Sequence, residues 1–285
     1  MKKNLLYLGL IMLCTSAFLL FVFMYQQGID NQAPTIHFSD EVLEYSVLDP
    51  RDAFLKGVTA RDNVDGDVTD SVVVASVQLV NKSGAVRVTY AAFDAAGNAT
   101  TAVRKAKFTD YAPPTFSLNR SMTFPDNVEF NISPMFQAED KLDGDISHRV
   151  RVTPLGDAPI SEPGTHDVEV RVNNSLGDTV RLVIPVEVYA SGTYEATLGL
   201  TDYLVYLPVG GKLDANSYLD TYTLGSSISL RDGLPNGYTL KMKNNVQPDV
   251  PGVYTVEYRV TQTIGTGIYA REHTGYAKLI VVVEG

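Results

Sequence analysis

The sequence predicts an all-β protein, built from tandem β-sandwich modules and preceded by one transmembrane helix. Three observations predict this class. Sequence landmarks recur at a period of about 80 residues. Short segments alternate apolar and polar residues between turn-forming residues. The N-terminus carries one long apolar run without a charge. Outside that run, no stretch keeps a helical apolar period, so little helix is expected.

The internal repeat rests on four landmarks. The motif DNVDGDVT at residues 62–69 returns as DKLDGDIS at residues 140–147, an offset of 78 residues. Ala33-Pro34 returns as Ala112-Pro113 at an offset of 79 residues. The strand GAVRV and the turn DAAG, starting at 84 and 94, return as GTHDV and NSLG at an offset of 80. One shared spacing indicates copies of a single folding unit.

The first module is expected over residues 30–111. Residues 42–47, 72–77 and 101–108 read as strands because β-branched and aromatic residues are frequent in them. In the strand between the last two, Val86, Val88, Tyr90 and Ala92 should share one face. A turn at residues 94–98 closes this strand.

The second module is expected over residues 112–189 and the third over residues 190–285, with joints near Tyr111 and Tyr189. In the third, PGVYTVEY at 251–258 matches PGTHDVEV at 163–170, and residues 277–283 read as a closing strand. The Asp-Gly-Asp motif is missing there. We therefore expect a diverged third module with a separate task.

The N-terminal run extends from Leu5 to Tyr25 without a charge. A helix of this length reaches about 30 Å, enough to cross a hydrocarbon core. A cleaved secretory signal is the alternative, but no small-x-small site follows the run. We expect residues 1–29 to be a cytoplasmic tip and a signal anchor. Lys2 and Lys3 then place the N-terminus in the cytoplasm and the modules outside.

The net charge and the cysteine content limit the kinds of partner and metal site that the modules can have. The chain of 285 residues has a formal net charge of −10, which does not favour nucleic acid. Cys14 is the only cysteine and lies in the apolar run, so the modules have no disulfide and no thiolate metal site. They must be held together by hydrophobic burial.

The motif at 62–69, the strand at 84–90 and the turn FDAAGN at 93–98 resemble bacterial immunoglobulin-like repeats of surface proteins and of an insecticidal crystal protein. The resemblance is close over residues 33–111, partial over 112–189 and limited to the strand near Pro251 beyond that. It implies immunoglobulin-like β-sandwiches and a scaffolding or adhesive role on a bacterial surface, with Gram-positive bacteria favoured. It implies no particular ligand.

The aspartate loops are the sharpest chemical feature. Calcium prefers carboxylate and carbonyl oxygens, so the candidate metal ligands are the loop carboxylates Asp62, Asp65, Asp67, Asp140, Asp143 and Asp145. An EF-hand does not fit this spacing, and the second copy has His148 where the first has Asp70. The favoured alternative is a structural turn, in which Asp side chains cap backbone N–H groups and the Gly takes a positive φ. No cofactor other than possible calcium is expected.

An enzyme is not expected. The four histidines are widely separated, and no nucleophile elbow or phosphate-binding glycine loop is present. Of the 16 tyrosines, 11 lie between Tyr189 and Tyr276. Tyrosine suits a binding surface, but it is also an ordinary strand residue. Both readings stay open.

These expectations combine into one function. We expect a non-catalytic, single-pass protein of the cell membrane, whose extracellular modules bind a protein or cell-wall polymer near the membrane, or act as a spacer. The alternative is an accessory subunit of a membrane enzyme or transport complex, in which Leu5–Tyr25 makes specific helix contacts.

Overall fold

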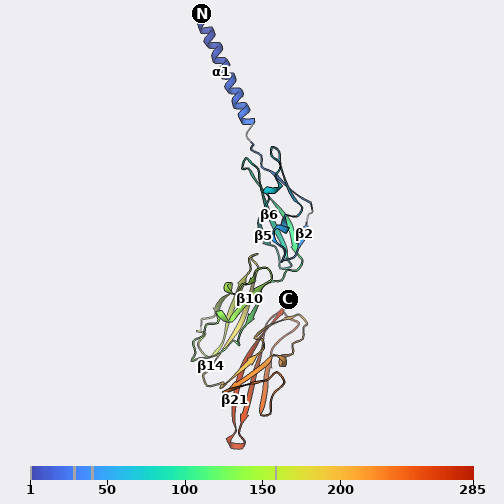
Figure 1. Cartoon of the computed structure of the whole chain (residues 1–285). Coiled ribbons are helices and arrows are strands. Elements are labelled where there is room, and N and C mark those ends of the chain that lie inside the picture. The colour runs from blue at the N-terminus through green and yellow to red at the C-terminus, as the bar shows by residue number, and fades with distance from the viewer. Residues whose placement is uncertain (1, 28–29, 40–41, 158) are drawn as a thin grey trace. The chain divides into compact units, whose positions relative to one another are not determined.

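The computed structural model describes residues 2–27, 30–39, 42–157 and 159–285. One α-helix, six short 3₁₀ helices and 21 strands make up its regular structure (Figure 1). The predicted all-β class with a single helix is thereby confirmed. Contacts divide the chain into two compact units, one ending at Tyr111 and the other spanning Ala112–Gly285. This division falls at Tyr111, and the expected three-domain organisation stays a prediction.

The helix α1 spans Lys2–Gln27. The predicted transmembrane run lies on it, although the side chains of residues 2–6, 8, 26 and 27 fall outside the described part. Over the described residues, no helix is both long and apolar enough to cross a membrane. The expected transmembrane helix is therefore not supported by the structure.

The first module forms two sheets. One is three-stranded with the order β1-β3-β4, and the other is four-stranded with the order β2-β7-β6-β5. The strands are β1 (Thr35–Phe38), β2 (Val42–Tyr45), β3 (Val58–Asp62), β4 (Gly66–Asp67), β5 (Val73–Leu79), β6 (Ala85–Phe93) and β7 (Ala99–Phe108). The 3₁₀ helices η1 (Arg51–Leu55) and η2 (Thr69–Ser71) connect them.

Strand β6 supplies the core of the first module. Val86, Val88, Tyr90 and Ala92 are at most 2% exposed, which confirms the predicted face. Two aromatic contacts extend this core, since the rings of Tyr45 and Phe54 lie 4.3 Å apart and Tyr90 packs on Phe38. The buried Tyr90 hydroxyl donates to the Phe54 carbonyl oxygen at 2.7 Å, so it is not left unsatisfied.

The second module repeats this arrangement strand for strand. Its sheets have the orders β8-β10-β11 and β9-β14-β13-β12. The strands are β8 (Thr115–Leu118), β9 (Thr123–Pro125), β10 (Phe136–Asp140), β11 (Gly144–Asp145), β12 (Arg151–Leu155), β13 (Gly164–Asn173) and β14 (Thr179–Tyr189), with η3 (Ser133–Met135) and η4 (Ser147–Arg149) between them. In both modules a short early strand, β2 or β9, pairs in parallel with the last strand.

The third module keeps the strand order of the four-stranded sheets, but its remaining strands belong to the same sheet and do not form a second one. The order β16-β21-β20-β19 repeats that of the four-stranded sheets, while β15 joins β18 and β17 to β21 in one seven-stranded sheet. The strands are β15 (Ala196–Leu200), β16 (Leu204–Pro208), β17 (Leu219–Leu224), β18 (Ser226–Ser229), β19 (Tyr238–Asn244), β20 (Gly252–Ile264) and β21 (Arg271–Glu284), with η5 (Ala215–Tyr218) and η6 (Gly267–Tyr269). The diverged sequence therefore corresponds to a diverged sheet.

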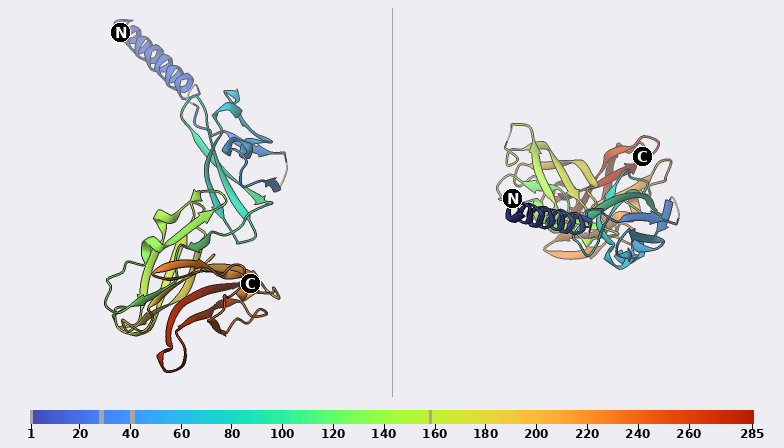
Figure 2. Two further views of the ribbon diagram at one scale, coloured as in Figure 1. Left: turned by 60° about the horizontal axis from the view of Figure 1, so that its bottom comes forward. Right: turned by 90° about the horizontal axis from the view of Figure 1, so that it is seen from above.

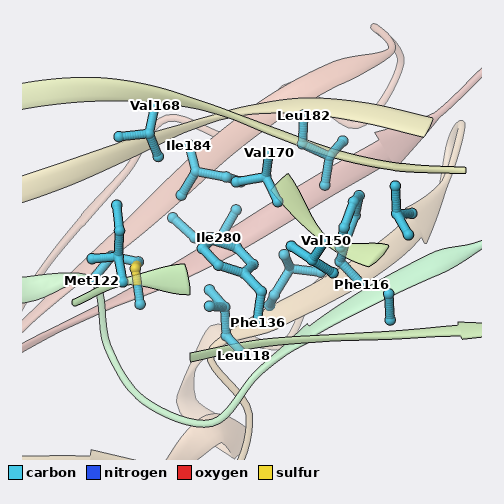
Figure 3. Close-up of a cluster of buried hydrophobic side chains, with 14 of the residues drawn as sticks. Phe116, Leu118, Met122, Phe136, Val150, Val168, Val170, Leu182, Ile184 and Ile280 are labelled. Carbon is cyan, nitrogen blue, oxygen red and sulfur yellow. The ribbon is translucent and has the colours of Figure 1, made fainter. Parts of the chain in front are cut away.

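The second and third modules share a hydrophobic core. Leu204, Ile280 and Val282 of the third module lie in one buried cluster with side chains of the second, and Figure 3 shows Ile280 between Ile184 and Phe136. Burial of this apolar surface against the second module stabilises both modules together.

Polar contacts reinforce the shared core. The Tyr206 hydroxyl accepts the Phe116 N–H at 2.8 Å, and burial raises the pKa of Tyr206 to about 12. Lys278 is 3% exposed, and its ammonium group lies 3.2 Å from Glu187. A buried ammonium group requires such a partner. The predicted joint near Tyr189 thus lies inside one compact unit, and the separate identity of the second and third domains stays a prediction.

The shared core yields a stability prediction. Ile280→Ala should lower the free energy of unfolding of residues 112–285 by about 2–5 kcal/mol, because it leaves a cavity between the modules. Amide hydrogen exchange, measured by peptide mass, should then rise in β13 and β14 as well as in β21.

The matched control for this experiment is Val88→Ala in the first module, where the side chain is equally buried. It should raise exchange only in the first module. Unchanged protection of β13 and β14 in Ile280→Ala would show that the second module is stable independently of the third.

Candidate functional site

The first aspartate loop joins β3 to β4. Asp62 ends β3, and its Oδ1 accepts the backbone N–H groups of Val64 at 2.8 Å and Asp65 at 2.9 Å. Gly66 has a φ of +76°, a conformation that glycine adopts without steric cost. The hypothesis of a capped turn is therefore confirmed for this loop.

The second loop has the same backbone. Asp140 Oδ1 accepts the N–H groups of Leu142 and Asp143 at 2.9 and 3.0 Å, and Gly144 has a φ of +70°. In each loop the last carboxylate accepts the N–H group of the first residue of the following 3₁₀ helix. Asp67 Oδ1 accepts from the Thr69 N–H at 3.0 Å, and Asp145 Oδ1 accepts from the Ser147 N–H at 2.9 Å.

Three carboxylates converge at the first loop. Asp30, Asp62 and Asp65 each offer one oxygen, and these oxygens lie within 4.8 Å of one another. The predicted ligands Asp62 and Asp65 are thus together, while Asp67 and the second-loop aspartates belong to no such group within the described part of the chain. Sequence reasoning missed Asp30, because no motif or spacing connects the start of the first module with this loop.

Two oxygens in this cluster are buried without a donor. Among the described residues, neither Asp30 Oδ2 nor Asp62 Oδ2 has a hydrogen-bond partner, and Asp62 is only 9% exposed. The neighbouring turn brings one donor, the Ala95 N–H, which lies 2.7 Å from Asp65 Oδ2, but no positive charge. Its own carboxylate, Asp94, accepts from the backbone and side-chain N–H groups of Asn98 at 2.7 and 2.8 Å. The first loop therefore concentrates negative charge.

The second loop supplies donors to its carboxylates. The Arg149 guanidinium lies 2.6 Å from Asp143 Oδ2, and Ser175 donates to both oxygens of Asp143 at 2.6 Å. The Asn174 amide donates to Asp140 Oδ2 at 3.1 Å. The Asn174 amide thus meets the oxygen of Asp140 whose counterpart, Asp62 Oδ2, has no donor in the first loop, and Arg149 adds a positive charge.

These contacts lower several carboxyl pKa values. Hydrogen bonds from the N–H groups of Asp65 and Val64 lower the pKa of Asp62. Bonds from Thr69 and Ser147 likewise lower the pKa values of Asp67 and Asp145. Burial alone would raise the pKa of Asp143, but donors from Ser175 and Arg149 outweigh it and lower that pKa.

The tyrosines of the third module mostly serve packing. Tyr222, Tyr258 and Tyr276 are buried, and Tyr276 stacks on Tyr194 with ring centroids 4.9 Å apart. Burial also raises the pKa of Tyr258 well above its ordinary value. For these residues the ordinary strand reading is confirmed.

One tyrosine is an exception. Strands β20 and β21 extend as a long hairpin, and Figures 1 and 2 show its tip projecting beyond the sheet. At this tip Ile268 is 91% exposed and Tyr269 is 80% exposed, with Ile264 half exposed below them. Sequence reasoning missed this pair, because nothing in the local pattern separates a hairpin tip from another loop.

The paired sheets of the first two modules define an all-β sandwich class. Residues 54–107 match the family model described as "Bacterial surface protein, Ig-like domain". This match confirms the resemblance expected from the first module. No curated protein matches the chain.

Three solved structures are distantly similar to the chain. One is the structure of CBM51-2 in complex with GlcNAc and INT domains from Clostridium perfringens ZmpB, which is 16% identical to this chain with a TM-score of 0.23. The aligned region covers 87% of this chain and 44% of the ZmpB chain. The protocadherin GammaB4 extracellular domain is 10% identical, covering 90% and 50% (TM-score 0.21). Drosophila N-cadherin EC1-4 is 14% identical, covering 89% and 67% (TM-score 0.24). The chain spans about half the length of the first two chains.

The lowered pKa values predict acid sensitivity. An unfolded Asp has a pKa of about 3.9, so each depressed carboxyl contributes stability that is complete above that pH. This stability is lost as pH falls through the lower folded value. The melting temperature should therefore drop steeply below about pH 4.

Asp145→Asn isolates one such group, since its side-chain oxygen can still accept from Ser147 but does not titrate. The variant should show a shallower fall in melting temperature between pH 5 and pH 2. An unchanged slope would mean that Asp145 has the same pKa in the folded and unfolded states.

Proposed function

We propose that this chain is a non-catalytic surface protein of a bacterium, in which extracellular immunoglobulin-like modules carry a binding tip on the hairpin of β20 and β21. The match of residues 54–107 to a bacterial surface family supports the location. The shared core of residues 112–285 supports a stable binding unit, because the second and third modules bury side chains in one apolar cluster.

The exposed hairpin tip is the observation that carries the binding role. Ile268 and Tyr269 present an aliphatic and an aromatic side chain to solvent side by side. Rigid aromatic and aliphatic anchors of this kind dominate the energy of protein–protein contacts when a partner buries them. The preferred partner is a protein, since a glycan offers less apolar surface to an isoleucine; a cell-wall polymer is the other partner to test.

The membrane tether in this proposal rests on the sequence. Leu5 to Tyr25 carries no charge, and Lys2 and Lys3 precede it. Most described side chains of α1, including Leu10 and Phe18, are apolar and exposed, and the hydroxyls of Thr15 and Ser16 donate to carbonyl oxygens of the helix itself. A helix that is apolar all round requires a membrane or a partner to cover it. The proposed topology places the N-terminus in the cytoplasm and the modules outside.

The hairpin tip gives a direct test. Binding of fluorescent residues 30–285 to cells lacking the gene for this chain would be measured by flow cytometry. Ile268→Ser with Tyr269→Ser should weaken binding by about thirtyfold or more, the effect of losing about 2 kcal/mol at a hot spot.

The control is Val209→Ser, which alters a half-exposed apolar residue elsewhere in the third module and should leave binding unchanged. Loss of binding after protease treatment of the cells identifies a protein partner, whereas loss after peptidoglycan hydrolase identifies the wall. Equal binding by the tip variant would refute the proposed contact.

Replacing Leu5–Tyr25 with an unrelated apolar helix distinguishes a generic membrane tether from the accessory-subunit alternative. A generic tether predicts unchanged surface display and unchanged tip-dependent binding. Correct display with lost function would instead favour a subunit that contacts another membrane protein through its helix.

A further inference from the structure

We propose that Asp30, Asp62 and Asp65 form a calcium site at the start of the first module. Their three oxygens lie within 4.8 Å of one another. The proposal is independent of the hairpin tip and of the membrane tether, because it rests on the geometry of this loop alone.

The buried oxygens show what this cluster lacks. Asp62 Oδ1 is saturated by two backbone N–H groups, but its Oδ2 is buried without a donor among the described residues, as is Asp30 Oδ2. A buried anionic oxygen costs free energy unless a positive charge or donor meets it. Three neighbouring carboxylates also repel one another. A divalent cation would remove both penalties at once.

The donor set fits a hard cation. All three groups offer carboxylate oxygens, which calcium prefers over nitrogen or sulfur ligands. Asp65 is exposed, so water can complete the six to eight ligands that calcium takes. The flexible coordination of calcium also suits this open loop better than the strict octahedron of magnesium.

The second loop provides an internal comparison. Its backbone is the same, yet Arg149, Ser175 and Asn174 already donate to its carboxylates. At the corresponding positions the first module has Ser71, Ala95 and Asp94. The Ala95 N–H donates to Asp65 Oδ2 at 2.7 Å, as the Ser175 N–H does to Asp143, but none of the three adds a positive charge. The two loops therefore differ in the neighbours that neutralise them, and only the first is expected to bind an ion.

A cation at this site would fasten the N-terminal segment to the module. Asp30 lies five positions after Tyr25 in the sequence. Its carbonyl oxygen already accepts from the Asn98 amide at 3.1 Å. Calcium would add a second attachment through its carboxylate, so that extracellular calcium stabilises the folded first module by mass action.

The test is calorimetric titration of the full chain in detergent with calcium chloride, after removal of metal by a chelator. We expect one ion per chain. Asp30→Asn and Asp62→Asn should each weaken binding by about tenfold or more, because each removes a charged ligand. Asp67→Asn, in the same loop but outside the cluster, and Asp140→Asn, in the second loop, should bind as the unaltered chain does.

The melting temperature gives a second readout if Asp62→Asn folds poorly. Calcium should raise it in the unaltered chain and not in Asp30→Asn, where the amide oxygen can still cap Gln32. Magnesium at equal concentration should give a smaller shift. Absence of saturable heat in the unaltered chain, or loss of binding in Asp140→Asn but not in Asp30→Asn, would overturn the proposal.

Discussion

Burial along one central hairpin per module is the interaction on which the structure depends. In each module two long antiparallel strands turn every second side chain inward, and Val88, Val168 and Val256 are fully buried at equivalent places. No disulfide assists them, because the only cysteine, Cys14, lies in α1. With the hairpins stabilised by packing, the loops at the ends can differ between modules without loss of the fold.

The aspartate loops illustrate that freedom. One turn geometry, fixed by a capping carboxylate and a glycine, occurs in two electrostatic settings. Position 94 holds an aspartate where position 174 holds an asparagine, and position 71 holds a serine where position 149 holds an arginine. The second turn is thereby internally neutralised, whereas the first keeps open acceptors. Duplication has preserved the backbone while two neighbouring substitutions have changed the chemistry.

The sequence predicted what is local. Alternation from Val86 to Ala92 identified a strand and its buried face, and the repeated motif identified the capped turns. The repeat spacing placed a joint near Tyr111, the residue at which the contacts divide the chain into two units. Contacts between distant segments were not predictable, because no repeat or alternation in the sequence marks them. Examples are the approach of Asp30 to Asp62 and the hydrogen bond between Tyr206 and Phe116. The shared core of residues 112–285 was missed for the same reason.

The parallel pairing of each module's early strand with its last strand has a mechanical consequence. Strands β2 and β7, β9 and β14, and β16 and β21 run side by side in the same direction. A force that pulls the two ends of a module apart slides such strands lengthwise, so their hydrogen bonds are strained together instead of opening one by one. The third module, with five paired residues from Leu204 to Pro208, offers the longest such clamp. Under shear from flow or a moving neighbour, these modules would resist extension at the points where the chain enters and leaves them.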